Sequence, residues 1–426
     1  MEIAKIHQLF LKSNGISTDT RKIKTNTLFF ALKGDNFDGN KYAQLALDYG
    51  ASYAIIDDKN IPKTEKIILV KDSLKTLQDL ASYHRKQIDI PIIALTGSNG
   101  KTTTKELINQ VLSSTYNTIA TYGNLNNHIG VPLTLLSMTK NTEIGIVEMG
   151  ANHLKEIEFL CKIASPDYGY ITNIGKAHLE GFGNLEGVLQ GKTELYKHLK
   201  QHNKLIFLNS ADNKLSKAAI GTKTLTFSNS PNSDVTVQLE SITPMVHLNY
   251  QNTTIKSNLI GKYNFSNIAA AIAIGNYFKV TPKNIKKAIE SYTPSNNRSQ
   301  IITKNQSTII LDAYNANPSS MSAAIDNFEI LEHNSKTVFL GDMFELGEKA
   351  KAEHQEIVDH LSNTSFSQIH LIGQNFARTD NQDPRIFTYT SFDDFKHKWK
   401  QTQSNSTAIL IKGSRGMKLE RILDLL

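Results

Sequence analysis

The segment from Ile92 to Lys105 reads IIALTGSNGKTTTK and joins an apolar run to a turn of small residues, a lysine and three threonines. The apolar run follows Pro91 and is typical of a buried parallel strand. Apolar residues then recur at helical spacing from Leu107 to Leu112, which predicts a helix over residues 104–112. A strand, a glycine turn and a helix in this order predict a polyphosphate-binding loop.

The residue types of the turn suit this chemistry. Gly97 and Gly100 allow the backbone to curl so that successive N–H groups point inward, where the helix N-terminus adds partial positive charge. Lys101 supplies a full charge for the outer phosphates, and the Thr102 hydroxyl suits magnesium. The loop departs from the usual pattern because Leu95 stands where a glycine is expected. This shortened loop points away from most ordinary phosphate-loop proteins.

Composition bounds the class of protein. With 426 residues, 20% charged and 39% hydrophobic, the chain is long enough for two to four globular domains. The net charge of +7 could attract nucleic acid, but the lysines alternate with acids and form no basic block. A solvated lysine-rich surface is the simpler interpretation of this charge. Attraction of small polyanionic substrates is the alternative that the motifs below favour, and no nucleic-acid partner is expected.

The cellular setting follows from a few features. Cys161 is the only cysteine, so no intrachain disulfide can form, and a reducing cytoplasm is expected. The spacing of Cys161 with Leu160 and Ile157 predicts a packed core thiol. Charged residues near the N-terminus argue against a signal peptide, and the apolar run 268–274 is too short for a membrane span. A soluble, cytoplasmic protein without membrane insertion is predicted.

Alternating strands and helices predict an α/β protein of three domains, with boundaries at 1–86, 87–297 and 298–426. The N-terminal unit has expected strands at 27–32, 53–56 and 66–70 and a helix at 42–48. The central unit has expected strands at 92–95, 144–149, 168–172 and 205–208, an antiparallel excursion over 229–256 and a helix at 266–277. The C-terminal unit has expected strands at 308–311, 337–340, 369–372 and 408–411, with helices at 320–331 and 350–361.

Two more residues are predicted to lie at the ligand edge of the central sheet. Glu148 ends an apolar strand, where a carboxylate is costly unless it meets a cation, so a Mg²⁺ role is expected. A solvated strand-end acid is the alternative for this residue. Because ligands gather at the carboxyl ends of parallel strands, Glu148 should lie beside Lys101. His178 lies in the loop after the next expected strand; a lone histidine is usually structural, but this one sits at the ligand edge of the sheet. The spacing of Lys192 carries no signal.

Six motifs in order show a family resemblance. They are TGSNGKTTTK (96–105), GNLNNHIGVPLTLL (123–136), VEMGANH (147–153), DAYNANPSS (312–320), GDMFELG (341–347) and KGSRGMKLE (412–420). Together they resemble the Mur ligases, over a match that runs from DTRKIKTNTLFFALKGDNFDGN (19–40) almost to the end of the chain. The resemblance implies an N-terminal uridine-nucleotide domain, a central parallel-sheet ATPase domain and a C-terminal Rossmann-like domain.

The resemblance also implies substrates and cofactors. The expected reaction joins D-Ala-D-Ala to UDP-N-acetylmuramoyl-tripeptide (UDP-MurNAc-tripeptide) at the expense of ATP, with two Mg²⁺ ions, in a monomer. The reaction activates a carboxylate as an acyl phosphate, which the amine of the dipeptide then attacks. Lys101, Glu148, His178 and Lys192 are the implied catalytic residues, and Thr102, Glu148, His178 and Lys192 are the implied metal-site residues. A carbamate on Lys192 would turn a cation into an anionic oxygen ligand for magnesium.

The remaining implied contacts fall into two sets. The ATP-binding set is Thr96, Gly97, Ser98, Asn99, Gly100, Lys101, Thr102, Thr103, Asn264, Asn267, Arg298 and Asp312. The substrate-binding set is Thr20, Arg21, Lys33, Gly34, Asp38, Gly39, Asn126, Asn127, Asn315, Asn317, Lys412, Ser414 and Arg415. The sequence departs from the family pattern at Asn40, where members often carry histidine.

Three alternatives remain open from the sequence. A folylpolyglutamate synthetase-like ligase would begin close to its phosphate loop, whereas residues 1–90 precede Pro91 here. A nucleic-acid-dependent NTPase would explain the basic charge, although the dispersed lysines argue against it. A non-catalytic nucleotide-binding regulator would not need Lys101, Glu148 and His178 together.

Overall fold

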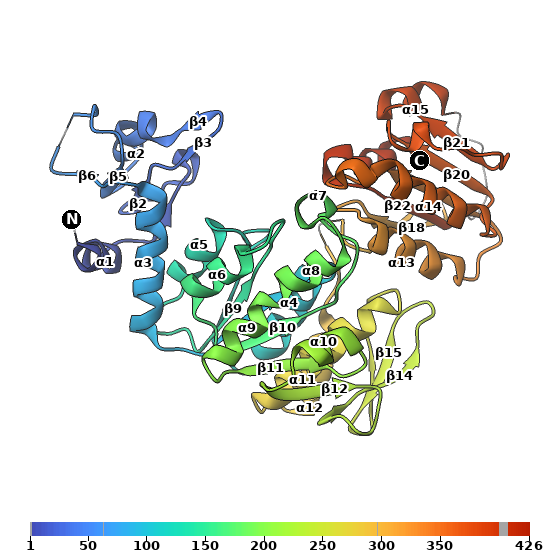
Figure 1. The fold of residues 1–426 in the computed structure, drawn as a ribbon, viewed down its shortest axis with the longest axis horizontal. Helices are drawn as coiled ribbons and strands as arrows, with labels where there is room; N and C mark the ends of the chain where they lie inside the picture. The colour runs from blue at the N-terminus through green and yellow to red at the C-terminus, as the bar shows by residue number, and fades with distance from the viewer. Residues whose placement is uncertain (1, 63, 296, 400–407) are drawn as a thin grey trace.

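A computed structural model describes residues 2–62, 64–295, 297–399 and 408–426. Three α/β domains follow one another along the chain, and the N- and C-terminal domains stand on opposite sides of the central one (Figure 1). The arrangement is an open arch, with the phosphate loop in its middle part. Among the described residues, no helix is both long and apolar enough to span a membrane.

The N-terminal domain is a small parallel sheet with strand order β1-β2-β5-β6, accompanied by a two-stranded β3–β4 hairpin. Its elements are α1 (Ile3–Leu11), β1 (Ile16–Ser17), β2 (Leu28–Phe30), β3 (Lys33–Gly34), β4 (Phe37–Asp38), α2 (Ala43–Asp48), β5 (Tyr53–Ile56), β6 (Ile67–Leu69) and α3 (Ser73–Ile88). Asp72 caps α3 by accepting the Lys75 N–H at 2.8 Å, which satisfies one of the donors left open at a helix start.

Helix α3 fastens this domain to the central one. The Arg85 side chain donates to the carbonyls of Ala164 and Ser165 at 3.1 and 3.2 Å and pairs with Asp167 at 2.8 Å. Two helical turns earlier, Gln78 donates to the His128 carbonyl at 3.1 Å. The predicted domain boundary at residue 86 therefore lies inside a helix that packs on central helices α5 and α6, and it stays a prediction.

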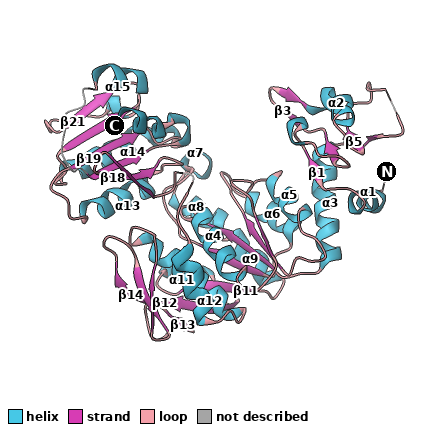
Figure 2. Ribbon diagram, turned by 180° about the vertical axis from the view of Figure 1, so that it is seen from behind, coloured by secondary structure: helices cyan, strands magenta, loops and turns pink. Residues whose placement is uncertain are grey.

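The central domain is built on a seven-stranded parallel sheet of order β13-β12-β11-β10-β7-β9-β8. The seven strands of this sheet are β7 (Ile92–Thr96), β8 (Thr118–Ala120), β9 (Ile144–Glu148), β10 (Tyr168–Ile171), β11 (Leu205–Asn209), β12 (Lys223–Ser228) and β13 (Val235–Thr236). The domain also contains β14 (Gln238–Ser241), β15 (His247–Tyr250) and β16 (Thr253–Lys256), which form a separate sheet. Its helices are α4 (Lys101–Leu112), α5 (Gly130–Leu136), α6 (Glu156–Ala164), α7 (Leu179–Phe182), α8 (Leu185–Lys192), α9 (Glu194–Gln201), α10 (Asn213–Ala218), α11 (Tyr263–Tyr277) and α12 (Pro282–Ser291). Helices lie on both sides of the sheet (Figure 2), so β7 and β9 are fully buried, as continuous apolar runs require.

The C-terminal domain is a six-stranded sheet of order β17-β18-β22-β19-β20-β21, parallel except for the edge strand β17. Its elements are β17 (Gln300–Lys304), β18 (Ser307–Asp312), α13 (Pro318–Glu329), β19 (Lys336–Gly341), α14 (Ala350–Ser362), β20 (Gln368–Ile372), β21 (Ile386–Tyr389), α15 (Phe392–Lys398) and β22 (Ala408–Lys412). Asn317 caps α13 in a reciprocal capping box with Ser320, and Pro318 occupies the first helical turn.

Most expected elements are confirmed, and the differences have local causes. The antiparallel excursion is confirmed for β14–β16, but β13 pairs in parallel with β12 and extends the main sheet. Helix α4 begins at Lys101 rather than Thr104, because Gly100 adopts a left-handed conformation with φ 77° and starts the helix there. Cys161 is buried in α6, and burial raises the pKa of its thiol, as expected of a core residue.

Candidate active site

Three adjacent strand ends form the floor of the site. Strand β7 pairs with β9 on one side and with β10 on the other, so the loops after all three leave the same edge of the sheet. The loop after β7 is the phosphate loop, Glu148 is the last residue of β9, and Asn173 follows β10. The sheet order thereby brings together residues that the sequence separates widely.

The phosphate loop has the shape that a bound polyphosphate needs. Gly97 has φ 139°, and a Cβ added there would lie 2.0 Å from the Thr172 hydroxyl oxygen. A Cβ at Gly100 would lie 2.8 Å from Asn267 Oδ1, so both positions exclude a side chain. Asn173 holds the loop from below, accepting the Ser98 N–H at 3.0 Å through its carbonyl. The N–H groups at the start of α4 then face the space above the loop.

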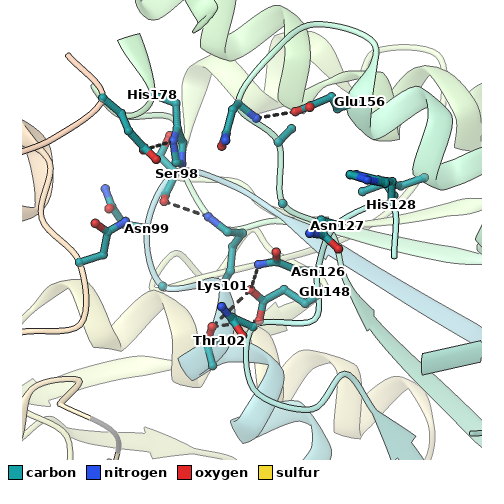
Figure 3. A pocket seen from close by; sticks show the side chains of 18 of the residues that line it. Ser98, Asn99, Lys101, Thr102, Asn126, Asn127, His128, Glu148, Glu156 and His178 are labelled. Atoms are coloured by element: carbon teal, nitrogen blue, oxygen red, sulfur yellow. Dashed lines mark hydrogen bonds and ion pairs between the residues drawn. The ribbon is translucent and has the colours of Figure 1, made fainter. Parts of the chain in front are cut away.

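Lys101 lies over its own loop. Its Nζ donates to the Gly97 carbonyl at 2.7 Å and to the Ser98 carbonyl at 3.1 Å, and Figure 3 draws the contact with Ser98. Burial lowers the pKa of Lys101, and the Glu148 carboxylate acts in the opposite direction. Loop carbonyls are weaker partners for an ammonium than phosphate oxygens, so the side chain is poised for an anionic ligand.

Glu148 is 1% exposed and has neutral hydrogen-bond donors as neighbours. The Thr102 hydroxyl donates to Oε2 at 3.0 Å, and the Asn126 amide donates to Oε1 at 2.8 Å (Figure 3). No ion pair involves this carboxylate among the described residues, and a buried carboxylate without a cation is costly. The oxygen atoms of Glu148 and Thr102 therefore fit one magnesium ion. No group of three or more acidic, histidine or cysteine residues that could hold a metal occurs in the described chain.

Lys192 is the last residue of α8 and is fully buried. Its Nζ donates to the Ala151 carbonyl at 2.9 Å and lies 5.2 Å from the centre of the Phe182 ring. Burial lowers the pKa of Lys192 well below its ordinary value, and the positive charge of Lys101 lowers it further. The pocket thus favours the neutral amine, the form that reacts with CO₂.

His178 lies beside the phosphate loop but contacts a residue of the C-terminal domain. Its Nδ1 lies 2.5 Å from Glu345 Oε2, and this contact lowers the pKa of the Glu345 carboxyl. The backbone of His178 adopts a left-handed conformation with φ 51° at the start of α7. Glu345 was not among the predicted site residues, although it lies in the GDMFELG motif.

Two cavities flank the loop. The first, of about 820 Å³, holds Lys101, Glu148 and His178 in its wall, together with Asn126 and Asn127. The second, of about 710 Å³, lies on the other side. Its lining includes the predicted nucleotide contacts Thr103, Asn264, Asn267, Arg298 and Asp312. Arg298 lines both cavities and stacks on Tyr314, with its guanidinium carbon 3.5 Å from the ring centre.

The predicted substrate residues of the C-terminal domain fall into two groups. Asn315 lines both cavities, and Lys412 lines the second, where it pairs with Asp312 at 2.5 Å. Ser414 and Arg415 line neither cavity.

Asn317 joins the C-terminal domain to the phosphate loop. Its amide donates to Asn99 Oδ1 at 2.7 Å across the domain junction. Asn317 thus makes a contact between domains in this structure, and its predicted contact with substrate stays a prediction.

The six predicted uridine-site residues lie in the N-terminal domain, away from both cavities. They are Thr20, Arg21, Lys33, Gly34, Asp38 and Gly39. Arg21 pairs with Asp19 at 2.8 Å and Lys33 pairs with Asp57 at 2.8 Å, so both cations carry local partners.

Asn40, the departure from the family pattern, is 1% exposed and packed inside this domain. Its amide nitrogen donates to Asp38 at 2.8 Å and to Asp57 at 2.9 Å, and its oxygen accepts the Asp57 N–H at 3.0 Å. Asparagine at this position therefore ties the β4 turn to the end of β5.

Comparison with known proteins identifies the class. Family models match three segments: the Mur ligase family catalytic domain at 12–85, the Mur ligase middle domain at 95–275 and the Mur ligase glutamate ligase domain at 297–415. The chain belongs to the Mur ligase family.

Individual relatives narrow the comparison. The UDP-N-acetylmuramoyl-tripeptide–D-alanyl-D-alanine ligase of Bacillus subtilis is 37% identical, over 96% of this chain and 92% of that protein. The crystal structure of MurF from Acinetobacter baumannii is 29% identical, with a TM-score of 0.85 over 98% of this chain and 97% of that one. MurF ligase from Thermotoga maritima in complex with ADP is 27% identical, with a TM-score of 0.84 over 98% and 97%.

Similarity between this chain and folylpolyglutamate synthetases is limited to the fold. A folylpolyglutamate synthase from Mycobacterium tuberculosis is 13% identical, with a TM-score of 0.61 over 82% of this chain and 94% of that one. Its sequence identity and its TM-score are both lower than those of the MurF structures, which favours a MurF-like ligase over a folylpolyglutamate synthetase.

Proposed function

We propose that this protein joins D-alanyl-D-alanine to UDP-MurNAc-tripeptide, with conversion of ATP to ADP and phosphate. The observation that carries the proposal is the meeting of Lys101, Thr102 and Glu148 at one cavity on the domain junction. The relatives named for this reaction match the chain over nearly its whole length.

The chemistry explains why a nucleotide is needed. A peptide carboxylate is a poor electrophile, because attack by an amine would have to expel oxide. One carboxylate oxygen bonds to the γ-phosphorus of ATP while the bond to the β–γ bridging oxygen breaks, which leaves ADP and an acyl phosphate. The dipeptide nitrogen then attacks the acyl carbon and loses a proton, and the carbon–oxygen bond breaks to release phosphate.

The chain's own residues orient and stabilise this sequence. The glycine loop and the start of α4 offer N–H groups to the phosphates, and Lys101 neutralises charge on the group in transfer. Asn264, Asn267, Arg298 and Asp312 are proposed to bind the nucleoside portion of ATP in the second cavity. The N-terminal residues around Thr20, Lys33 and Asp38 are proposed to bind the uridine nucleotide.

Magnesium is proposed at two positions. Thr102 and Glu148 would hold the first ion, and His178 with carbamylated Lys192 would hold the second. Bound magnesium would withdraw charge from the phosphoryl oxygens. The buried, neutral-favouring pocket of Lys192 supports carbamylation, because only the free amine adds to CO₂. For the second ion, His178 must leave Glu345, which it contacts in this structure.

One assay tests the function. ADP release is measured with ATP, Mg²⁺ and UDP-MurNAc-tripeptide, with and without D-Ala-D-Ala, and the sugar product is identified by mass. Rapid ADP release that depends on the dipeptide, with formation of the pentapeptide, is the expected result. ADP release that is the same with and without D-Ala-D-Ala, or that requires DNA or RNA, would overturn the proposal.

A further inference from the structure

The GDMFELG segment, residues 341–347, has no part in the steps above, yet the fold holds it rigidly at the cavity edge. It follows β19, and the Asp342 carboxylate accepts the N–H groups of Asn375 and Phe376 at 3.0 Å each. Two residues on, the Phe344 N–H donates to the Ser414 hydroxyl at 3.0 Å. Ser414 lines neither cavity, and its hydroxyl instead helps to fix the position of this loop.

The loop projects Glu345 toward the central domain. Glu345 has φ 61°, an uncommon conformation for a residue with a side chain, and its carbonyl accepts the Glu180 N–H at 3.1 Å. The carboxylate lines the first cavity, and 51% of the side chain is exposed. A strained backbone conformation thus presents one carboxylate of the C-terminal domain to the cavity that is lined by Lys101.

Five carboxylates line the two cavities in the described part of the chain, and Glu345 differs from the other four. Those four already accept hydrogen bonds from backbone N–H, hydroxyl, amide or lysine groups: Glu148 from Thr102 and Asn126, Glu156 from Asn152 and His153, Asp212 from Lys214 and Leu215, and Asp312 from Ser299 and Lys412. Among the described residues, Glu345 has one side-chain partner, the imidazole of His178, and 51% of its side chain is exposed. Because Glu148 is buried and assigned to magnesium, Glu345 is the half-exposed carboxylate that can accept an organic cation once His178 moves to the metal.

We propose that Glu345 binds the amino group of the incoming dipeptide and so places it in the cavity. The proposal rests on the function proposed above. A free α-amine carries a positive charge near neutral pH, and carboxylates bind such groups through short, charge-assisted hydrogen bonds. The electrophile forms on the central-domain wall at Lys101, while Glu345 comes from the C-terminal wall. The two reactants would then approach from opposite domains.

The test separates dipeptide binding from the earlier step. For Glu345→Gln, we expect the KM for D-Ala-D-Ala to rise about tenfold or more, because one charged partner is lost. The KM values for ATP and UDP-MurNAc-tripeptide should stay within about twofold. Hydroxylamine, which is small and uncharged at pH 7.5, should trap the acyl phosphate as a hydroxamate at the wild-type rate. Glu345→Asp should recover part of the dipeptide affinity.

Glu348→Gln is the matched control, since Glu348 lies three residues further along, is exposed and lines neither cavity. It should behave as wild type in all assays. An unchanged KM for D-Ala-D-Ala in Glu345→Gln would overturn the proposal, and so would an equal loss of hydroxamate formation. If the wild-type protein itself forms no hydroxamate from UDP-MurNAc-tripeptide and ATP, the proposed function fails instead, which is a different result.

Discussion

Among single residues, Lys101 carries the clearest prediction. Replacing it by alanine should remove about 3 kcal/mol of transition-state stabilisation, about a hundredfold or more in kcat/KM. The fold should survive, because Nζ hydrogen-bonds to the loop carbonyls of Gly97 and Ser98 and the side chain lines the first cavity. Steady-state ADP release and circular dichroism measure both effects, with exposed Lys197→Ala as the control. A folded Lys101→Ala protein with near-normal turnover would disprove the phosphate-loop assignment.

Lys192 carries the second prediction for a single residue. Its side chain could act as a carbamate or as an ammonium group, and the two states predict different results. If Lys192 is carbamylated, Lys192→Ala should lose most activity, and acetate or formate should restore part by supplying carboxylate oxygens. Lys192→Arg keeps the charge but cannot be carbamylated at neutral pH, so it should stay inactive. ADP release with and without added carboxylates is the measurement. An active arginine variant, or rescue of the alanine variant by amines alone, would show that the ammonium acts directly.

At the scale of an element, strand β20 should make the stability of the C-terminal domain depend on pH. His370 on β20 is buried among aromatic rings, with the Phe339 ring centre at 4.8 Å, and burial lowers its pKa to about 4. The unfolded chain binds this proton at its ordinary pKa near 6.5, so the unfolded state binds more protons below that pH. The contribution of His370 to the free energy of unfolding is therefore present above pH 6.5 and is lost as the pH falls from 6.5 toward 4. Between pH 7.5 and pH 5 the expected loss is about 2 kcal/mol.

The only tryptophan of the chain makes this measurable. Trp399 lies 4.9 Å from the His370 ring, so its fluorescence reports unfolding of this domain in denaturant. His370→Phe should reduce the loss between pH 7.5 and pH 5 by about 2 kcal/mol, whereas exposed His333→Gln should keep it. Identical pH profiles for wild type and His370→Phe would refute the assignment.

For the whole molecule, the domain junction predicts closure on ligand binding. Both cavities combine central-domain residues with Arg298, Tyr314 and Asn315, so ligands that fill them draw the C-terminal domain inward. By contrast, α3 holds the N-terminal domain through Arg85 and its buried partners. Small-angle scattering should show a smaller radius of gyration when an ATP analogue and UDP-MurNAc-tripeptide are present together. A radius that does not change with both ligands would argue against a mobile C-terminal domain.

Local sequence determined the features that depend on neighbouring residues. The phosphate loop was predictable because one strand, two glycines and one helix lie within residues 92–112, and their conformations follow from residue type. Glu148 was predictable as a strand-end acid for the same reason. The three α/β domains followed from alternation of elements, and the family resemblance supplied the reaction and most of the site residues.

Tertiary structure decided the contacts between residues far apart in the chain. Sheet order placed β9 and β10 beside β7, which no local pattern specifies. The buried pocket that lowers the pKa of Lys192 is closed by the Ala151 carbonyl, 41 positions away. The contact of His178 with Glu345 joins two domains, and no periodicity within either segment encodes it. Such pairings depend on the packing of the complete fold, because burial and charge at these positions come from elements distant in sequence.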